Sequence, residues 1–76
     1  MVVELRDGLF INPNHISDLY VEPPGSGYHF SVAVRMSHGQ IHKIGRFGES
    51  LQALRELQRI VRILKKAEWR ENKKEW

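Results

Sequence analysis

The clearest pattern in the chain is an alternation of hydrophobic and polar residues over positions 28–36. The hydrophobic members are Tyr28, Phe30, Val32, Val34 and Met36, and the residues between them are His29, Ser31, Ala33 and Arg35. Successive side chains of a strand point to opposite faces of its sheet. The segment is therefore predicted to be a strand with one apolar and one polar face.

Shorter hydrophobic runs predict further strands at residues 2–6, 9–11, 16–22 and 41–47. Asp7-Gly8 separates the first two and predicts a hairpin with a type I′ turn. Asn12-Pro13-Asn14 interrupts the pattern, since proline has no N–H to donate to a sheet. The third run does not keep a strict period of two, so we expect a β-bulge near Ser17-Asp18.

The pairing of the last two strands stays open on sequence grounds. With His38-Gly39 at the tip of the turn, the expected partners are Met36 and Ile41, Val34 and Lys43, and Phe30 and Phe47. Ile44 then points away from the apolar face. Either a bulge shifts the register, or the second face of the sheet is partly covered.

The last part of the chain has the period of a helix. At about 100° per residue, one side collects Ala53, Leu54, Leu57, Ile60, Val61 and Leu64. Either Gly48 or Ser50 is expected to be the N-cap. Glu68 and Glu71 fall on the same side as the apolar stripe, so the helix is expected to leave the sheet near Ala67.

These elements predict an α+β fold: an antiparallel β-meander of four to five short strands, covered on one face by a single C-terminal helix. We expect one domain over residues 1–67, with residues 68–76 as a helix extension or a frayed charged tail.

A resemblance to known proteins supports the same fold. It is carried by Asp7-Gly8, by Asn12-Pro13-Asn14-His15-Ile16, by the turn at Gly39 and by the helix start Phe47-Gly48-Glu49-Ser50. Over roughly residues 2–64 this order of turns resembles FlbD-type small flagellar proteins and the C-terminal half of LytTR-type DNA-binding domains. The longer loop at 23–27 and the basic tail depart from both. The resemblance implies a fold and transfers no functional residue.

The composition excludes several classes of protein. Of the 76 residues, 41% are hydrophobic and 28% are charged, too apolar a balance for a disordered chain. There is no cysteine, which excludes disulfides and thiolate chemistry. No apolar run approaches the roughly 18 residues of a membrane span, and the acids near the start are unlike a signal peptide. We expect a cytoplasmic protein with no membrane partner.

Catalysis and cofactor binding are not expected. A chain of this size has little room for a pocket of roughly 300 Å³ or more, and no catalytic triad can be recognised. The four histidines lack cysteine or nearby carboxylate ligands, so no metal site is expected either.

The charge is concentrated at the end of the chain. Residues 1–47 hold four Lys and Arg against four Asp and Glu, whereas residues 48–76 hold eight against five, which accounts for the net charge of +3. Six of these cations recur at helical spacings opposite the apolar stripe: Arg55, Arg59, Arg62, Lys66, Arg70 and Lys73. Arginine suits bidentate contacts to phosphate oxygens. We therefore expect a binding module whose helix contacts an anionic partner, nucleic acid first, with weak, salt-sensitive binding.

Two other surfaces compete with this interpretation. Ile63 and Trp69 lie off the apolar stripe and could form a protein interface, which would make the chain an adaptor or small inhibitor that docks on another protein or forms a homodimer. An acidic protein surface is the other anionic partner expected for the row of helix cations. On the polar face of the sheet, Arg35, His42 and Arg46 could form a second cationic patch.

Overall fold

The computed structural model describes residues 2–25 and 27–67. In chain order its elements are β1 (Val3–Arg6), β2 (Leu9–Ile11), a 3-10 helix (Pro13–His15), β3 (Ile16–Glu22), β4 (Phe30–Met36), β5 (Ile41–Phe47) and α1 (Ser50–Lys66). The expected α+β fold, with five antiparallel strands and one C-terminal helix, is confirmed. No helix within the described ranges is long and apolar enough to cross a bilayer.

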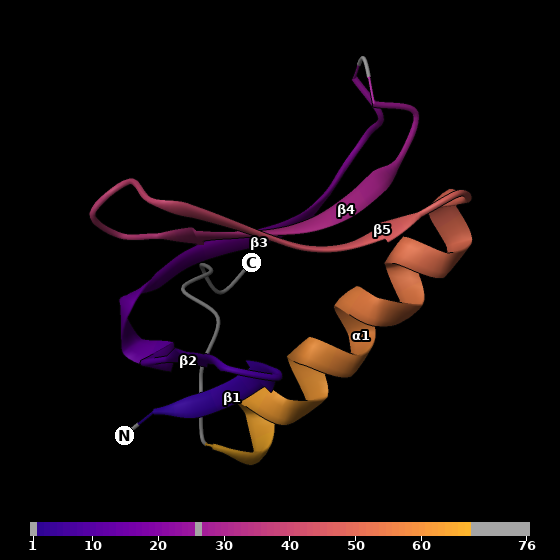
Figure 1. Cartoon of the computed structure of the whole chain (residues 1–76). Helices are drawn as coiled ribbons and strands as arrows, with labels where there is room; N and C mark the ends of the chain where they lie inside the picture. The colour runs from indigo at the N-terminus through magenta and orange to yellow at the C-terminus, as the bar shows by residue number, and fades with distance from the viewer. Residues whose placement is uncertain (1, 26, 68–76) are drawn as a thin grey trace, which may run out of the picture.

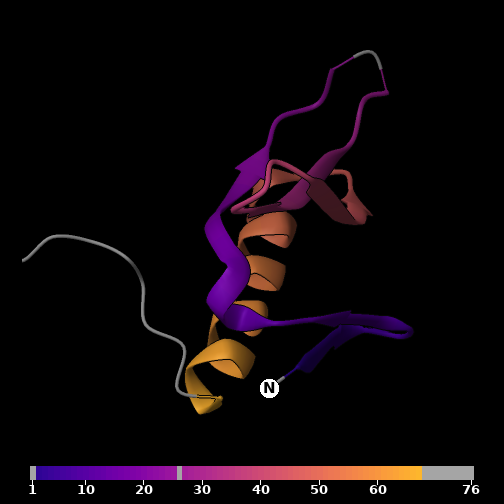
Figure 2. The same ribbon diagram turned by 90° about the vertical axis from the view of Figure 1, so that its left-hand side faces the viewer.

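The strands form two separate sheets. β1 pairs with β2, and β4 lies between β3 and β5 in a three-stranded sheet. Figure 1 shows α1 running below the three-stranded sheet, with its C-terminal end next to β1. In the view turned by 90°, the β1–β2 hairpin projects to one side, below the other sheet (Figure 2). The helix therefore closes the angle between the two sheets.

The core lies inside this angle. Its largest fully buried side chains come from all three parts of the fold: Leu5, Val32, Val34, Ile60 and Leu64. Burying an aliphatic side chain of this kind contributes about 1.5–3 kcal/mol. The hairpin and the three-stranded sheet thus share one helix as the main cover of their apolar faces.

The bulge expected in β3 is confirmed. Ile16 pairs with Met36 and Asp18 pairs with Arg35, so the register shifts at Ser17. Asn12 is the N-cap of the 3-10 helix before β3, and its Oδ1 accepts a hydrogen bond from the Asn14 N–H at 3.0 Å.

A second bulge answers the open question about β5. The pairs that the structure shows are Arg35 with Ile41, Val34 with His42, Ala33 with Lys43, Val32 with Ile44, and Phe30 with Phe47. The expected partners of Met36 and Val34 are therefore wrong by one residue, whereas the partner of Phe30 is right. The difference arises because Gly45 and Arg46 together lie opposite Ser31, and this extra residue puts Ile44 on the buried face.

Three local predictions are wrong. Gly8 has a φ of +83° and Asp7 does not share this left-handed conformation, so the first turn is not type I′. The helix N-cap is Glu49, whose N–H donates to Gln52 Oε1 at 3.2 Å. Tyr28 lies in the loop before β4 with a φ of +62°, and it is 83% exposed instead of facing the core.

The helix is also rotated from the expected orientation. Leu54, expected in the core, is 41% exposed, whereas Ile63 packs against the core cluster. The reason is that α1 covers β1 as well as the larger sheet. The buried stripe therefore centres on Ala53, Ile60 and Leu64 and turns away from Leu54.

Candidate nucleic-acid interface

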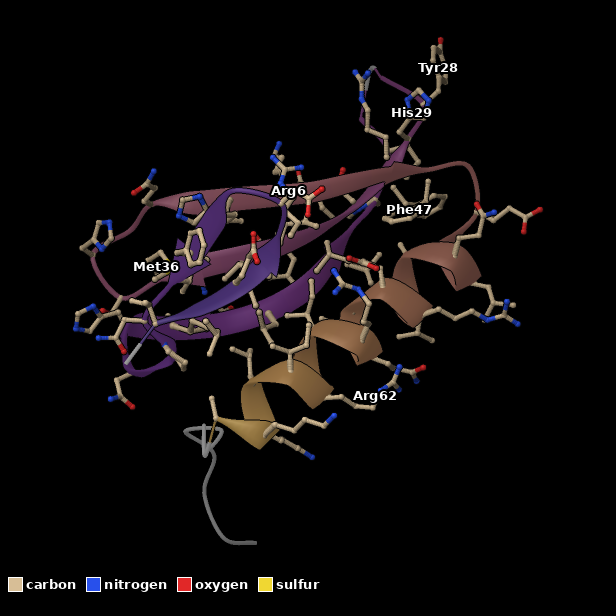
Figure 3. The ribbon with its side chains drawn as sticks, turned by 60° about the horizontal axis from the view of Figure 1, so that its bottom comes forward. Arg6, Tyr28, His29, Met36, Phe47 and Arg62 are labelled. Carbon is tan, nitrogen blue, oxygen red and sulfur yellow. The ribbon has the colours of Figure 1, made fainter. Side chains whose placement is uncertain are left out.

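The outward side of α1 carries four exposed cations, Arg55, Arg62, Lys65 and Lys66, which we call the basic face of α1. Arg62 extends from the helix away from the strands (Figure 3). Among the described residues, none of the four forms an ion pair with a carboxylate. At about 1.5 Å per residue, Arg55 and Lys66 lie about 16 Å apart along the helix axis.

Arg59, expected among the cations opposite the apolar stripe, differs from these four because its guanidinium is paired within the fold. Its Nε donates to Glu56 Oε1 at 2.9 Å, and its Nη2 donates both to Glu56 Oε2 and, at 2.8 Å, to the carbonyl oxygen of Leu5. Hydrogen bonding to Glu56 raises the pKa of Arg59 above its ordinary value, against a smaller opposing effect of burial. Arg59 therefore ties α1 to β1.

The other expected contact residues divide into two groups. Arg70, Lys73 and Trp69 lie outside the described residues. Ile63 is half-buried and packs against the core cluster, so only part of its side chain is exposed to a partner.

The second cationic patch does not form as expected. Val34 pairs with His42, so His42 shares the helix-facing side of the sheet, whereas Arg35 faces the open side. Arg35 also makes two hydrogen bonds to Asp18, at 2.8 and 2.9 Å, which raise its pKa. On this open face, the side of the sheet opposite α1, the charge of Lys43 is also offset, since its Nζ lies 3.1 Å from Glu22 Oε2.

Arg46 does reach a pocket, and its neighbour there was not expected from the sequence. The pocket lies beside the open face and is lined by Arg46 from β5 and Arg6 from β1, among others. The two residues are 40 positions apart, so spacing along the chain gives no sign of their meeting. The one local signal is Gly45, because a glycine within a strand pattern indicates a bulge that could redirect Arg46.

Within residues 2–25 and 27–67, no three His, Asp or Glu side chains lie close enough together to bind a metal ion. His38 instead lies 3.2 Å from the side-chain oxygen of Gln40 at the β4–β5 turn.

No known protein family, characterised protein or solved structure matches this chain. The resemblance to FlbD-type and LytTR-type proteins therefore stays a similarity in the order of turns and strands.

Proposed function

We propose that this protein is a non-enzymatic binding module that contacts the phosphates of a nucleic acid through the basic face of α1. The observation that carries this proposal is the row of exposed cations along one helix without a carboxylate partner among the described residues. Like charges at i,i+4 destabilise a helix by about 0.2–0.5 kcal/mol per pair. Arg62 and Lys66 have this spacing, so a bound polyanion would relieve a cost that the chain otherwise bears.

Only two of the four cations on the basic face of α1 can be explained by a contribution to helix stability. Lys65 and Lys66 lie in the last turn, where a cation also interacts favourably with the helix dipole. Arg55 and Arg62 lie in the earlier turns and gain nothing from the dipole. Their presence supports a role in binding.

The dimensions suit a nucleic acid backbone. A duplex has one phosphate of each strand per about 3.4 Å of its axis, so the roughly 16 Å between Arg55 and Lys66 spans a length of axis with about five phosphates on each strand. The strands wind around the axis, so only some of these phosphates face the helix. Contacts to phosphate give affinity without reading sequence. Binding is therefore expected to be weak, sensitive to salt and tolerant of sequence.

The test is fluorescence anisotropy with a labelled duplex at low salt. R62Q/K66Q removes one arginine and one lysine from the basic face, and R35Q/K43Q removes the same two residue types from the open face of the sheet. We expect the first variant to lose roughly 30-fold in affinity, at about 1 kcal/mol per contact. The second is expected to lose much less. Equal losses would mean that only net charge matters, and no binding by the native protein would remove the proposal.

A second candidate function, docking on an acidic protein, is favoured by two other side chains. Leu51 and Leu54 are 52% and 41% exposed and lie next to Arg55 on α1. Interfaces combine apolar anchors with a charged rim. L51S/L54S should weaken binding to an acidic protein and leave binding to a nucleic acid unchanged, which separates the two candidates.

A further inference from the structure

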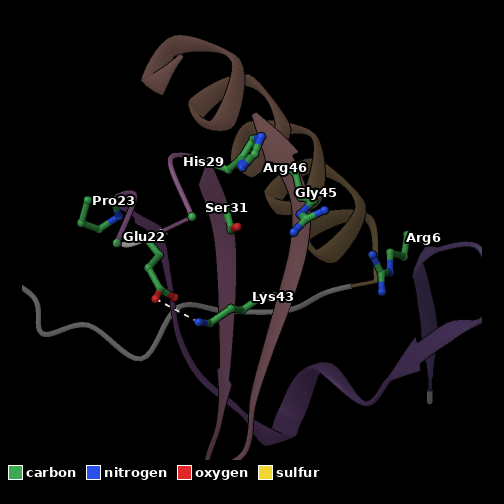
Figure 4. A pocket seen from close by; sticks show the side chains of 10 residues that line it. Arg6, Glu22, Pro23, His29, Ser31, Lys43, Gly45 and Arg46 are labelled. Atoms are coloured by element: carbon green, nitrogen blue, oxygen red, sulfur yellow. Dashed lines mark ion pairs between the residues drawn. The ribbon is translucent and has the colours of Figure 1, made fainter. Parts of the chain in front are cut away.

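A pocket of about 750 Å³ lies between the open face of the three-stranded sheet and the end of β1. The prediction that a chain of this size has little room for such a pocket is therefore wrong. Its polar lining includes Arg6, Glu22, His29, Ser31, Lys43 and Arg46. Both Arg6 and Arg46 line the pocket, and Figure 4 shows Arg46 on β5 with Arg6 to its right, on a strand of the other sheet. The basic face of α1 contributes no residue to it.

The β5 bulge explains how Arg46 comes to line this pocket. Gly45 has a φ of +78°, the left-handed conformation typical of the first residue of such a bulge. A Cβ atom at position 45 would be strained at this φ and would overlap the ring of Phe47 unless the ring moved, so glycine is favoured here. Because the bulge places two residues opposite Ser31, it changes the direction of Arg46 relative to a regular strand.

The charges in the pocket are unbalanced. Lys43 and Glu22 form an ion pair at its edge and offset each other. Arg6 and Arg46 have no carboxylate partner among the described residues. This leaves two arginines that line one space with a net charge of +2, whereas Arg35, outside the pocket on the same sheet, is paired with Asp18.

We propose that this pocket binds the phosphate group of a small phosphorylated molecule. A phosphate monoester carries about −1.5 to −2 charges at neutral pH, which balances the two arginines. Each guanidinium can donate two parallel hydrogen bonds to phosphate oxygens, and Ser31 and His29 add further possible donors. The volume exceeds that of a phosphate ion and falls within the roughly 300–1,000 Å³ of small-molecule sites. It leaves room for a group of the size of a nucleoside.

The test is a titration followed by the backbone amide resonances of the full chain. Inorganic phosphate and a nucleoside 5′-monophosphate are the two probes, and the nucleoside without phosphate is the control. Both phosphate-bearing probes should shift the amides around Ser31 and Arg46 and should saturate. R46Q and R6Q should each weaken binding about tenfold, the loss expected for a charge-assisted hydrogen-bonding partner. R35Q should bind both probes as the native protein does.

Three results would overturn the proposal: no saturable shift with either phosphate-bearing probe, unchanged binding in R6Q and R46Q, or equal binding of the nucleoside alone. All three variants change exposed side chains and are expected to fold. Their amide spectra check that they do. The result is independent of the function proposed above. R62Q/K66Q should bind phosphate in the pocket normally, and R46Q should retain most of the affinity for a duplex.

Discussion

The cations of this molecule differ in whether a carboxylate is within reach. On the open face of the sheet, Arg35 contacts Asp18 on the neighbouring strand and Lys43 contacts Glu22. On α1, Arg55 and Arg62 contact no carboxylate among the described residues, although they lie on the same helix as the paired Arg59. The charges of the paired cations are offset by contacts within the fold. The unpaired ones leave their charge available to a partner.

The largest loss of stability is expected at the β5 bulge, which places the unpaired Arg46 in the pocket. G45A should destabilise the protein by about 2–3 kcal/mol, because it combines the strain of a left-handed φ with a clash against Phe47. G8A is the matched control, since Gly8 has a φ of +83° and a Cβ atom there would meet nothing within 4 Å. Chemical denaturation measures both variants, and an equal loss in G8A and G45A would show that the Phe47 contact costs nothing.

A smaller loss of stability is expected for the paired cation of α1. R59Q removes the hydrogen bonds to Glu56 and to the carbonyl oxygen of Leu5, which should cost about 1–2 kcal/mol. R55Q, on the same helix, should leave the free energy of unfolding nearly unchanged. If R59Q reduces duplex binding more than R55Q does, then Arg59 belongs to the binding surface and the distinction between paired and unpaired cations is wrong.

An unpaired cation should change stability in the opposite direction. R62Q removes a like-charge neighbour of Lys66 and is expected to raise the free energy of unfolding by about 0.2–0.5 kcal/mol. The same variant should lower duplex affinity. A destabilised R62Q would indicate a structural contact that the side chain of Arg62 makes within the fold.

The smallest effect is expected for R35Q. The ion pair of Arg35 with Asp18 has good geometry, but both side chains are well exposed, and exposed pairs contribute little to stability. The melting temperature of R35Q should fall by less than that of R59Q. A larger fall would mean that cross-strand pairing on the open face holds the sheet together more strongly than the contact between α1 and β1.

Local features of the fold could be predicted from the sequence, whereas contacts between distant segments could not. The broken period around Ser17 predicted the β3 bulge, and the alternation over 28–36 predicted most of β4. The pairing of Arg59 with Leu5 could not be predicted, because it joins residues 54 positions apart. Its other partner, Glu56, lies three positions away on the helix, a spacing that does signal an ion pair.

In the candidate site, too, local spacing could be predicted and contacts between distant segments could not. Helical spacing alone was enough to place Arg55, Arg62 and Lys66 on one outward side. The partial burial of Ile63 depends on how far α1 rotates to cover the β1–β2 hairpin, and the apolar stripe of the helix does not determine that angle. The pocket arginines come from two sheets whose relative position is set by the shared core.

The most direct test of the account is the salt dependence of duplex binding. Four phosphate contacts from the basic face predict a slope of about −3.6 for the logarithm of the binding constant against the logarithm of the salt concentration, and R62Q/K66Q should reduce it to about −1.8. R35Q/K43Q should leave the slope near the native value. A native slope near zero, or an unchanged slope in R62Q/K66Q, would contradict the claim that these helix cations bind phosphates.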